Sequence, residues 1–384
     1  MVWWENLRRR SARWEPPERA FVALLVLVIG VALAKGGARE VHPYALSQYT
    51  YTYQHGFLIR GLPGELARWV CGKDAHCLES GAEVIGTLAL FGLVAVLLFV
   101  VKGQAWTRAS LLLLALVASG PALVSLGATR GYHDALTLLI GLLAYHFYRR
   151  DQLLLASACF CVALLVHELV AIFVLPLFVL EPSLLRFRQW SRRHTARVAT
   201  IAALGVAALG VVHFGHADRE QQRAITAALK RNAPHHQQGF RGYRAFGATA
   251  ATKRAPVTTK NARDLEQRRY QRYWLTPLLL GAGVIGLSLW KRRFAELPLW
   301  LVIGAAPHAI YLVAWDVDRM LSLTGLTALF VVLEILRRCE IRSAPLWVAL
   351  PVLAVIVWQL AEPYAQLTRR YARGDTWFQP KATP

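Results

Sequence analysis

Apolar residues along the chain fall into long runs that are separated by short, mostly charged segments. Several runs approach the roughly 20 residues that an α-helix needs to cross a bilayer. We therefore expect an all-α protein, a polytopic transmembrane helical bundle of about eleven membrane segments. The runs are 20–35, 83–101, 109–127, 133–148, 152–166, 169–183, 198–214, 274–290, 297–315, 319–336 and 345–361.

The stretch 152–183 could be one long helix or two short ones. Arg149 and Arg150 precede it, and an arginine-rich segment, 186–197, follows it. Because cytoplasmic loops collect Lys and Arg, both ends are expected to be cytoplasmic. The chain must then go out and return, so we predict a short hairpin with its turn near His167–Glu168.

The enrichment of Lys and Arg in cytoplasmic loops also predicts the topology of the rest of the chain. Basic segments that we assign to the cytoplasm alternate with two long outer loops, 36–82 and 216–273. The N-terminus is predicted inside and the tail 362–384 outside. Residues 1–361 are expected to form a single transmembrane domain in a bacterial inner membrane.

Composition agrees with a membrane protein. Charged residues make up 17% of the 384 residues, against roughly 25% in soluble domains. The formal net charge of +21 would suggest nucleic acid in a soluble protein. In a polytopic protein it is largely a topology signal, so we expect no nucleic-acid partner. The loop 216–273 keeps a net charge of +9, with Arg241 and Arg244 among its 13 basic residues, and could bind an anionic ligand or simply face lipid and solvent.

Two of the five cysteines lie in a polar segment, CGKDAHC, within the first outer loop. Cys71 and Cys77 could form a disulfide if that loop is periplasmic. Zinc is the weaker alternative, because the segment lacks a full set of ligands.

Unusual polar residues gather on the side predicted to be outside. Such residues next to hydrocarbon are costly and often functional. The first outer loop has Glu40 and the segment YQHGFLIRGLPG with Arg60, and the segment AWDVDRML has Asp318 and Arg319. The other candidates are Arg130, His133 and Asp134 in ATRGYHDAL, His167 and Glu168 in LVHELVA, and His308.

Each stretch also has a structural interpretation. Asp318–Arg319 could be an ion pair, Asp134 could favour a helix N-terminus, and His167–Glu168 could be a polar turn. GFLIRGLPG could be a re-entrant turn, and His308 a core histidine. The convergence of all these residues on one face favours a functional site over independent structural roles.

The residue types suggest transfer from a phosphate-linked donor. Arg60, Arg130 and Arg319 suit a phosphate at headgroup depth, because guanidinium binds phosphate bidentately. We expect Glu40, Asp134, Glu168 or Asp318 to supply a general base, and His133, His167 and His308 to contact substrate. Apolar flanks favour Glu168 and Asp318 as the base.

The layout resembles the GT-C class of polyprenyl-phosphate-dependent glycosyltransferases and the related O-antigen and exopolysaccharide polymerases. The shared features are a first span followed by a long outer loop, short spans and outer-face acids. YQHGFLIRGLPG and LVHE are similar to segments of such proteins. The resemblance implies an acidic base early in the first outer loop, for which Glu40 is the nearest match.

The sequence therefore predicts an integral-membrane glycosyltransferase or polysaccharide polymerase that uses an isoprenoid-(pyro)phosphate-linked sugar and a glycan acceptor. No cofactor is expected, although a divalent metal ion would suit the carboxylates. A transporter or flippase of an anionic lipid-linked molecule is the alternative, as is a non-catalytic subunit that binds an acidic polymer. Membrane lipids are expected partners in every case.

Overall fold

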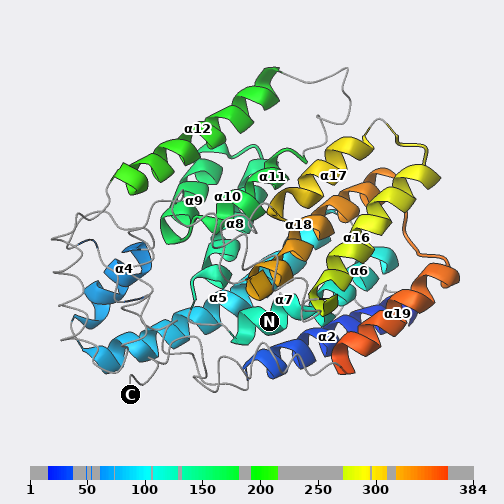
Figure 1. Ribbon diagram of the computed structural model, residues 1–384, viewed down its shortest axis with the longest axis horizontal. Helices are drawn as coiled ribbons and strands as arrows, with labels where there is room; N and C mark the ends of the chain where they lie inside the picture. The colour runs from blue at the N-terminus through cyan, green and yellow to red at the C-terminus, as the bar shows by residue number, and fades with distance from the viewer. Residues whose placement is uncertain are drawn as a thin grey trace, which may run out of the picture.

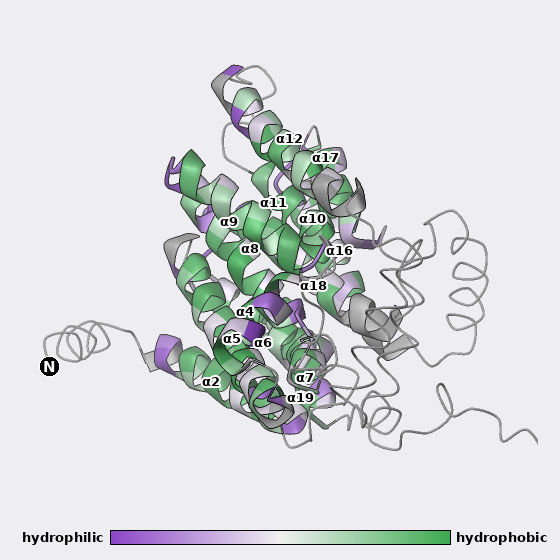
Figure 2. Ribbon diagram, turned by 90° about the vertical axis from the view of Figure 1, so that its left-hand side faces the viewer, coloured by the Kyte–Doolittle hydropathy of each residue, from purple (hydrophilic) through white to green (hydrophobic). Residues whose placement is uncertain are grey.

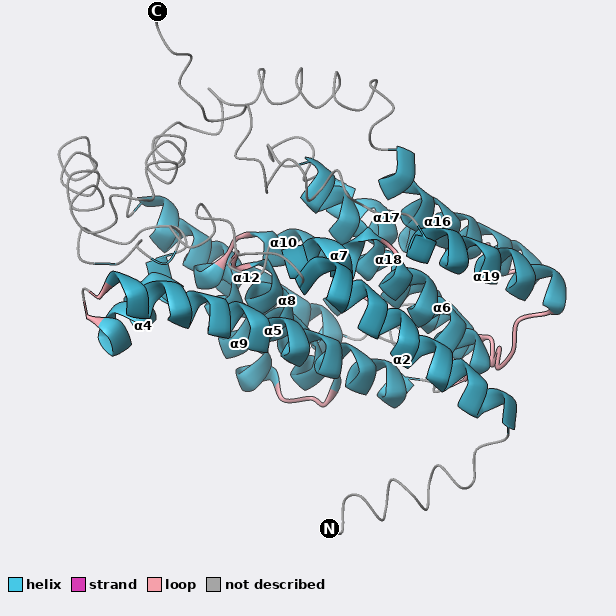
Figure 3. Cartoon of the chain, turned by 90° about the horizontal axis from the view of Figure 1, so that it is seen from below, coloured by secondary structure: helices cyan, strands magenta, loops and turns pink. Residues whose placement is uncertain are grey.

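The computed structural model describes residues 16–37, 49, 53, 61–72, 74–104, 107–128, 132–180, 192–214, 271–294, 296–308 and 317–361. The regular elements in this part of the chain are all helices, which confirms the prediction of an all-α protein (Figures 1 and 3). The helices are α2 (Pro16–Gly37), α4 (Gly61–Cys71), α5 (Ala75–Gln104), α6 (Arg108–Ser119), α7 (Pro121–Ala128), α8 (Asp134–Arg149), α9 (Leu153–Val166), α10 (Leu169–Phe173), α11 (Leu175–Phe178), α12 (Arg192–Phe214), α16 (Gln271–Trp290), α17 (Leu297–Ala305), α18 (Val317–Arg338) and α19 (Leu346–Ala361).

Each predicted apolar run contains a helix, but few of the described helices are both long and apolar enough by themselves to span a bilayer. Among the described residues, Glu18–Gly37 and Ser80–Lys102 have the length and hydropathy for a crossing. A bent pair, α6 with α7, would make a third. The remaining apolar stretches of the described helices are 10–17 residues long. Length and composition of the described helices thus support two or three crossings, fewer than the predicted eleven.

The run 109–127, predicted as one span, is broken at Gly120. Helices α6 and α7 meet there at 46°. Pro121 lacks a backbone N–H and disfavours helical geometry in the residue before it, and Gly120 is extended accordingly (φ −72°, ψ −177°). Ser119 beside the break donates a hydrogen bond to Gln359 Oε1 (2.6 Å), and Gln359 Nε2 donates to Thr276 Oγ1 (2.7 Å).

The stretch 152–183 turns at the predicted position. Helix α9 ends at Val166, His167 is extended, and α10 begins at Leu169. The chain then runs back along α8, since Phe178 contacts Tyr148 near the C-terminal end of that helix (ring centroids 5.0 Å apart). Two short breaks after Phe173 and Phe178 make this returning arm irregular.

Basic residues gather at one end of the bundle, here called the basic end. Arg197 of α12 donates hydrogen bonds to Asp151, in the turn after α8, and to the carbonyl of Tyr148 in the last turn of α8, both at 2.5 Å. The Ala109 amide donates to the Arg342 carbonyl (3.2 Å), which brings the start of α6 to the end of α18. The ring of Tyr145 in α8 contacts the ring of Phe330 in α18, with centroids 5.7 Å apart. This contact connects the α8–α12 pair to the α6–α18 pair. This end includes Arg149, Arg150, Arg337 and Arg338.

The opposite end is marked by the C-terminal ends of α2, α7 and α19. The backbones of α2 and α7 touch at Gly36 and Gly127: a Cβ on Gly36 would lie 2.7 Å from the Val124 carbonyl oxygen. The Lys35 ammonium donates to the Leu360 carbonyl of α19. Because α8 begins a few residues after α7, its N-terminus belongs to this opposite end too.

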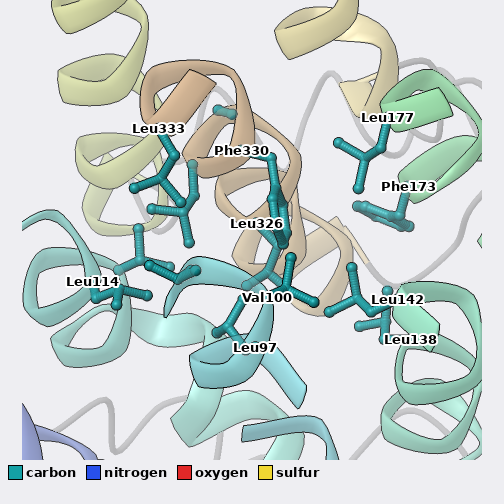
Figure 4. Packing of buried hydrophobic residues seen from close by; sticks show 14 of the residues in the cluster. Leu97, Val100, Leu114, Leu138, Leu142, Phe173, Leu177, Leu326, Phe330 and Leu333 are labelled. Carbon is teal, nitrogen blue, oxygen red and sulfur yellow. The ribbon is translucent and has the colours of Figure 1, made fainter. Parts of the chain in front are cut away.

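A continuous apolar core joins the two ends. Side chains from α5, α8, α10, α11 and α18 converge in it, among them Val100, Leu142, Phe173, Leu177 and Phe330 (Figure 4). The helices are hydrophobic along most of their length, with hydrophilic residues mainly near helix ends (Figure 2). Glu334, buried near the basic end, is hydrogen-bonded to both Arg337 and Arg338.

Helix α4 lies in the predicted first outer loop, where the sequence suggested a re-entrant turn at its first residues. It packs against α5 and is covalently tied to it by a Cys71–Cys77 disulfide, which favours the disulfide over the zinc alternative (Figure 1). Tyr53 contacts this helix by its ring, which lies where a Cβ on Gly61 would be, and by its amide, which donates to Glu65 (3.0 Å). Burial, together with the Glu65 charge, raises the pKa of Tyr53 to about 12.

Candidate functional site

Four of the predicted polar residues meet at the opposite end of the bundle. His133 and Asp134 stand at the start of α8, and His167 and Glu168 form the break between α9 and α10. Helices α8 and α9 pack side by side and run in opposite directions, so the start of one meets the end of the other. With Tyr49 these four residues are called the polar cluster below.

His167 lies between two carboxylates. Its Nε2 is 4.0 Å from Asp134 Oδ1, and its Nδ1 is 3.3 Å from Glu168 Oε2. The His167 and Asp134 side chains are almost fully buried, whereas 40% of the Glu168 side chain is exposed. The cluster therefore runs from a buried acid, through an imidazole, to an acid that solvent can reach.

A backbone hydrogen bond fixes the orientation of the His167 ring. The Leu169 amide, at the start of α10, donates to Nδ1 (3.1 Å). In the neutral ring the proton is consequently on Nε2 and is directed to the Asp134 side.

Tyr49 covers the polar cluster from the predicted outer loop. Its ring meets His133 edge-on, with centroids 4.7 Å apart, and it is almost fully buried. Burial raises the pKa of its phenol well above the usual value, so the hydroxyl stays protonated. Within the described part of the chain this hydroxyl has no hydrogen-bond partner, nor has Thr137 Oγ1 one turn after Asp134. Orphaned buried polar atoms are uncommon and call for an explanation such as a ligand or water.

Asp318 and Arg319 lie in the first turn of α18, which extends to the same end of the molecule. Tyr145 of α8 contacts Phe330 of α18, and both helices run towards the basic end. Asp318 is twelve residues before Phe330, as His133 is before Tyr145. The backbone thus places Asp318 near the level of the polar cluster.

The other predicted site residues are not brought to the cluster by the described structure. His308 follows α17, where its Nδ1 contacts the Ala305 carbonyl of the preceding turn (3.2 Å). Five residues lie outside the described part of the chain: Glu40, Arg60, Arg130, Arg241 and Arg244.

Sequence reasoning missed Tyr49 and Thr137. Thr137 carried a weak signal, because it lies three residues after Asp134 and therefore on the same helix face. Tyr49 is one of several tyrosines in a polar loop and carried no signal that separated it from the others.

Comparison with known proteins adds no functional information: no family model matches the chain, and neither a curated protein nor a solved structure does. Within the described ranges, no group of three or more His, Cys, Asp or Glu side chains could hold a metal ion.

Proposed function

We propose that this chain is an integral-membrane glycosyltransferase or polysaccharide polymerase that acts at the periplasmic face on an isoprenoid-(pyro)phosphate-linked sugar. The supporting observation is the polar cluster, in which buried His167 lies between Asp134 and the half-exposed Glu168. The cluster occupies the end of an apolar bundle opposite the basic end. Such charge asymmetry is typical of inner-membrane proteins with the basic end in the cytoplasm.

The disulfide supports the same orientation. Cys71 and Cys77 are joined near Tyr49 and Glu65, at the end that holds the polar cluster. Disulfides persist in the oxidising periplasm and are rare in the cytosol. In this orientation the apolar runs form about eleven membrane segments, and the shorter helices are accommodated by burial among other helices or by local thinning of the bilayer.

In this proposal Glu168 is the general base. An acceptor hydroxyl attacks the anomeric carbon of the donor, the bond from that carbon to the phosphate oxygen breaks, and Glu168 takes the hydroxyl proton. The isoprenoid phosphate leaves with the electron pair, and Arg319, with Arg60 and Arg130, stabilises its charge. Asp134 and His167 hold Glu168 in position.

The test is sugar transfer in membrane vesicles that contain the full chain and a radiolabelled isoprenoid-phosphate-linked donor. Glu168→Gln should lower turnover by roughly 10²-fold or more while donor binding is retained, because the variant cannot accept a proton. Asp134→Asn should cause a smaller loss, and Asp318→Asn tests the second candidate base. Arg319→Ala should weaken donor binding.

Glu340→Gln is the matched control, since Glu340 is an exposed acid near the basic end. It should leave transfer unchanged. If Glu168→Gln, Asp318→Asn and Arg319→Ala all insert and transfer sugar at the normal rate, the site lies elsewhere and the proposal is wrong.

Transport of the same kind of lipid-linked anion is the second candidate, and the break between α6 and α7 favours it. Broken helices with polar residues at the break are typical of substrate sites in transporters. Here Ser119, Gln359 and Thr276 form a buried hydrogen-bonded chain beside the break. A transporter would move a fluorescent lipid-linked sugar across liposomes without forming a glycosidic bond, and Gln359→Leu would abolish that movement while Glu168→Gln would not.

A further inference from the structure

Helix α4 has the reverse of the amphipathic pattern expected at a water-exposed surface. Its buried residues are small or polar, among them Gly61, Gly64 and Glu65. Its exposed residues are large and apolar: Leu66 is 47% exposed, Trp69 71% and Val70 84%. At 100° per residue these three lie within one face about 100° wide.

One covalent link holds α4 at a defined level of the bundle. The disulfide ties its last residue, Cys71, to Cys77 of α5. The apolar segment of α5 that can cross a membrane begins at Ser80, three residues further along. Three helical residues correspond to about 4.5 Å, so the C-terminal end of α4 is fixed within several ångströms of the level at which that segment starts.

We propose that α4 is an interfacial helix whose Leu66, Trp69 and Val70 face docks on the outer leaflet, at the boundary between headgroups and acyl chains. The side chains suit this surface, because tryptophan is enriched there and aliphatic residues reach the acyl chains. The inference rests on the membrane placement assumed under the proposed function but not on glycosyl transfer.

The polar residues of α4 face the protein instead of the lipid. Arg68 forms an ion pair with Glu65, and this hydrogen bond lowers the pKa of the Glu65 carboxyl, which stays ionised. Glu65 also accepts the Tyr53 amide. The charges of α4 therefore hold the outer-loop residue Tyr53 to the helix and leave the opposite face free for lipid.

A second copy of the chain is a poorer occupant of this face. Stable protein interfaces bury about 800 Å² on each partner. Three side chains on an eleven-residue helix supply only a fraction of that area. A bilayer needs no such minimum patch, because α5 already anchors the helix at the lipid boundary.

Docking of α4 on lipid would also affect the polar cluster, because α4 contacts Tyr49. On its inner face α4 contributes Ala67 to a small apolar group with Tyr49 and Ala82. Tyr49 in turn contacts His133. Helix α4 is therefore the element between the lipid surface and the Tyr49 side of the cluster.

The test places the photocrosslinker p-benzoylphenylalanine in the full chain at Trp69 or at Val70. The control position is Asp74, which is exposed but lies beyond the turn at Gly72. Each purified protein is reconstituted in vesicles of phosphatidylethanolamine and phosphatidylglycerol and illuminated, and lipid adducts are measured by mass spectrometry. Thiol labelling checks that Cys71 and Cys77 remain bonded.

We expect at least fivefold more lipid adduct at positions 69 and 70 than at 74. Equal yields at all three positions, no lipid adduct at 69 and 70, or crosslinks to a second copy of the chain would each overturn the proposal. No sugar donor is present, so the result is independent of whether the protein transfers sugars.

Discussion

In the polar cluster, the ring and the hydroxyl of Tyr49 have different roles. Its ring fills space against His133, whereas its hydroxyl is buried with no hydrogen-bond partner in the described structure. A buried hydroxyl without a partner costs about 1–3 kcal/mol, so it is retained at the expense of stability. A contact with substrate would explain its presence.

We predict that Tyr49→Phe leaves the free energy of unfolding unchanged or raises it by about 1 kcal/mol, because the ring stays and the orphaned hydroxyl is removed. Sugar transfer should nevertheless fall. Denaturant unfolding in detergent micelles and the vesicle transfer assay measure the two effects. Tyr49→Ala is the comparison and should destabilise by about 3 kcal/mol, since it empties a buried site. Loss of stability in Tyr49→Phe would show instead that the hydroxyl has a structural partner.

At the residue scale the sequence predicted the part of the cluster that interrupts apolar runs. Asp134, His167 and Glu168 were detectable because a polar side chain inside such a run is costly. Tyr49 was not detectable, since its burial depends on the path of a loop that the local sequence does not determine. The contact of His167 with Asp134 also required knowing that α8 and α9 run in opposite directions.

Helices α2 and α7 show how glycine sets the spacing of two elements. Gly36 and Gly127 allow direct backbone contact, and a Cβ at Gly36 would lie 2.7 Å from the Val124 carbonyl oxygen and 2.9 Å from the Gly127 Cα. Both neighbours are backbone atoms, so the contact cannot be relieved by a rotamer change. Close packing through small residues is a common means of helix association in membranes.

We predict that Gly36→Ala lowers the free energy of unfolding by about 1–3 kcal/mol, because the methyl group must push α2 and α7 apart. Gly30→Ala is the matched control in the same helix. A Cβ there meets nothing within 4 Å, so this variant should be neutral or more stable by up to about 1 kcal/mol. Equal unfolding free energies for the two variants in detergent would refute the close-packing argument.

At the element scale, apolar runs predicted where helices exist but not where they break. The break at Gly120 had a local signal in the dipeptide Gly-Pro, which the hydropathy of the surrounding run obscured. Helix α4 was missed because its apolar residues are few and its buried face is made of glycine, alanine and glutamate. Its stability depends on packing and on the disulfide, neither of which is a local property.

Among the described residues, arginines of α8, α12 and α18 gather at the basic end, and the polar cluster and the disulfide lie at the other. For the membrane placement proposed above, the positive-inside rule predicts that the basic end lies in the cytoplasm. Residues 150 and 190 flank an out-and-back excursion whose tip is His167–Glu168, so both should lie on that side.

We predict that reporter fusions after residues 150, 190 and 342 all report a cytoplasmic location. Fusions after residues 74 and 363 should report a periplasmic location. Activity of a periplasm-dependent phosphatase and fluorescence of a cytoplasm-dependent protein measure the two sides independently. Opposite locations for 150 and 190 would make 152–183 a single crossing and would reverse the assignment of everything after it.

The hydrogen bond from Lys35 to the Leu360 carbonyl joins the first described helix to the last. Helix α2 packs on α6, α7 and α19, so its environment is assembled from segments that lie far apart in the sequence. Because α19 is synthesised long after α2, this hydrogen bond can form only once α19 has emerged from the ribosome. A chain truncated before residue 346 would keep its polar cluster but lack the contact between α2 and α19. We expect membrane proteases to degrade such a chain.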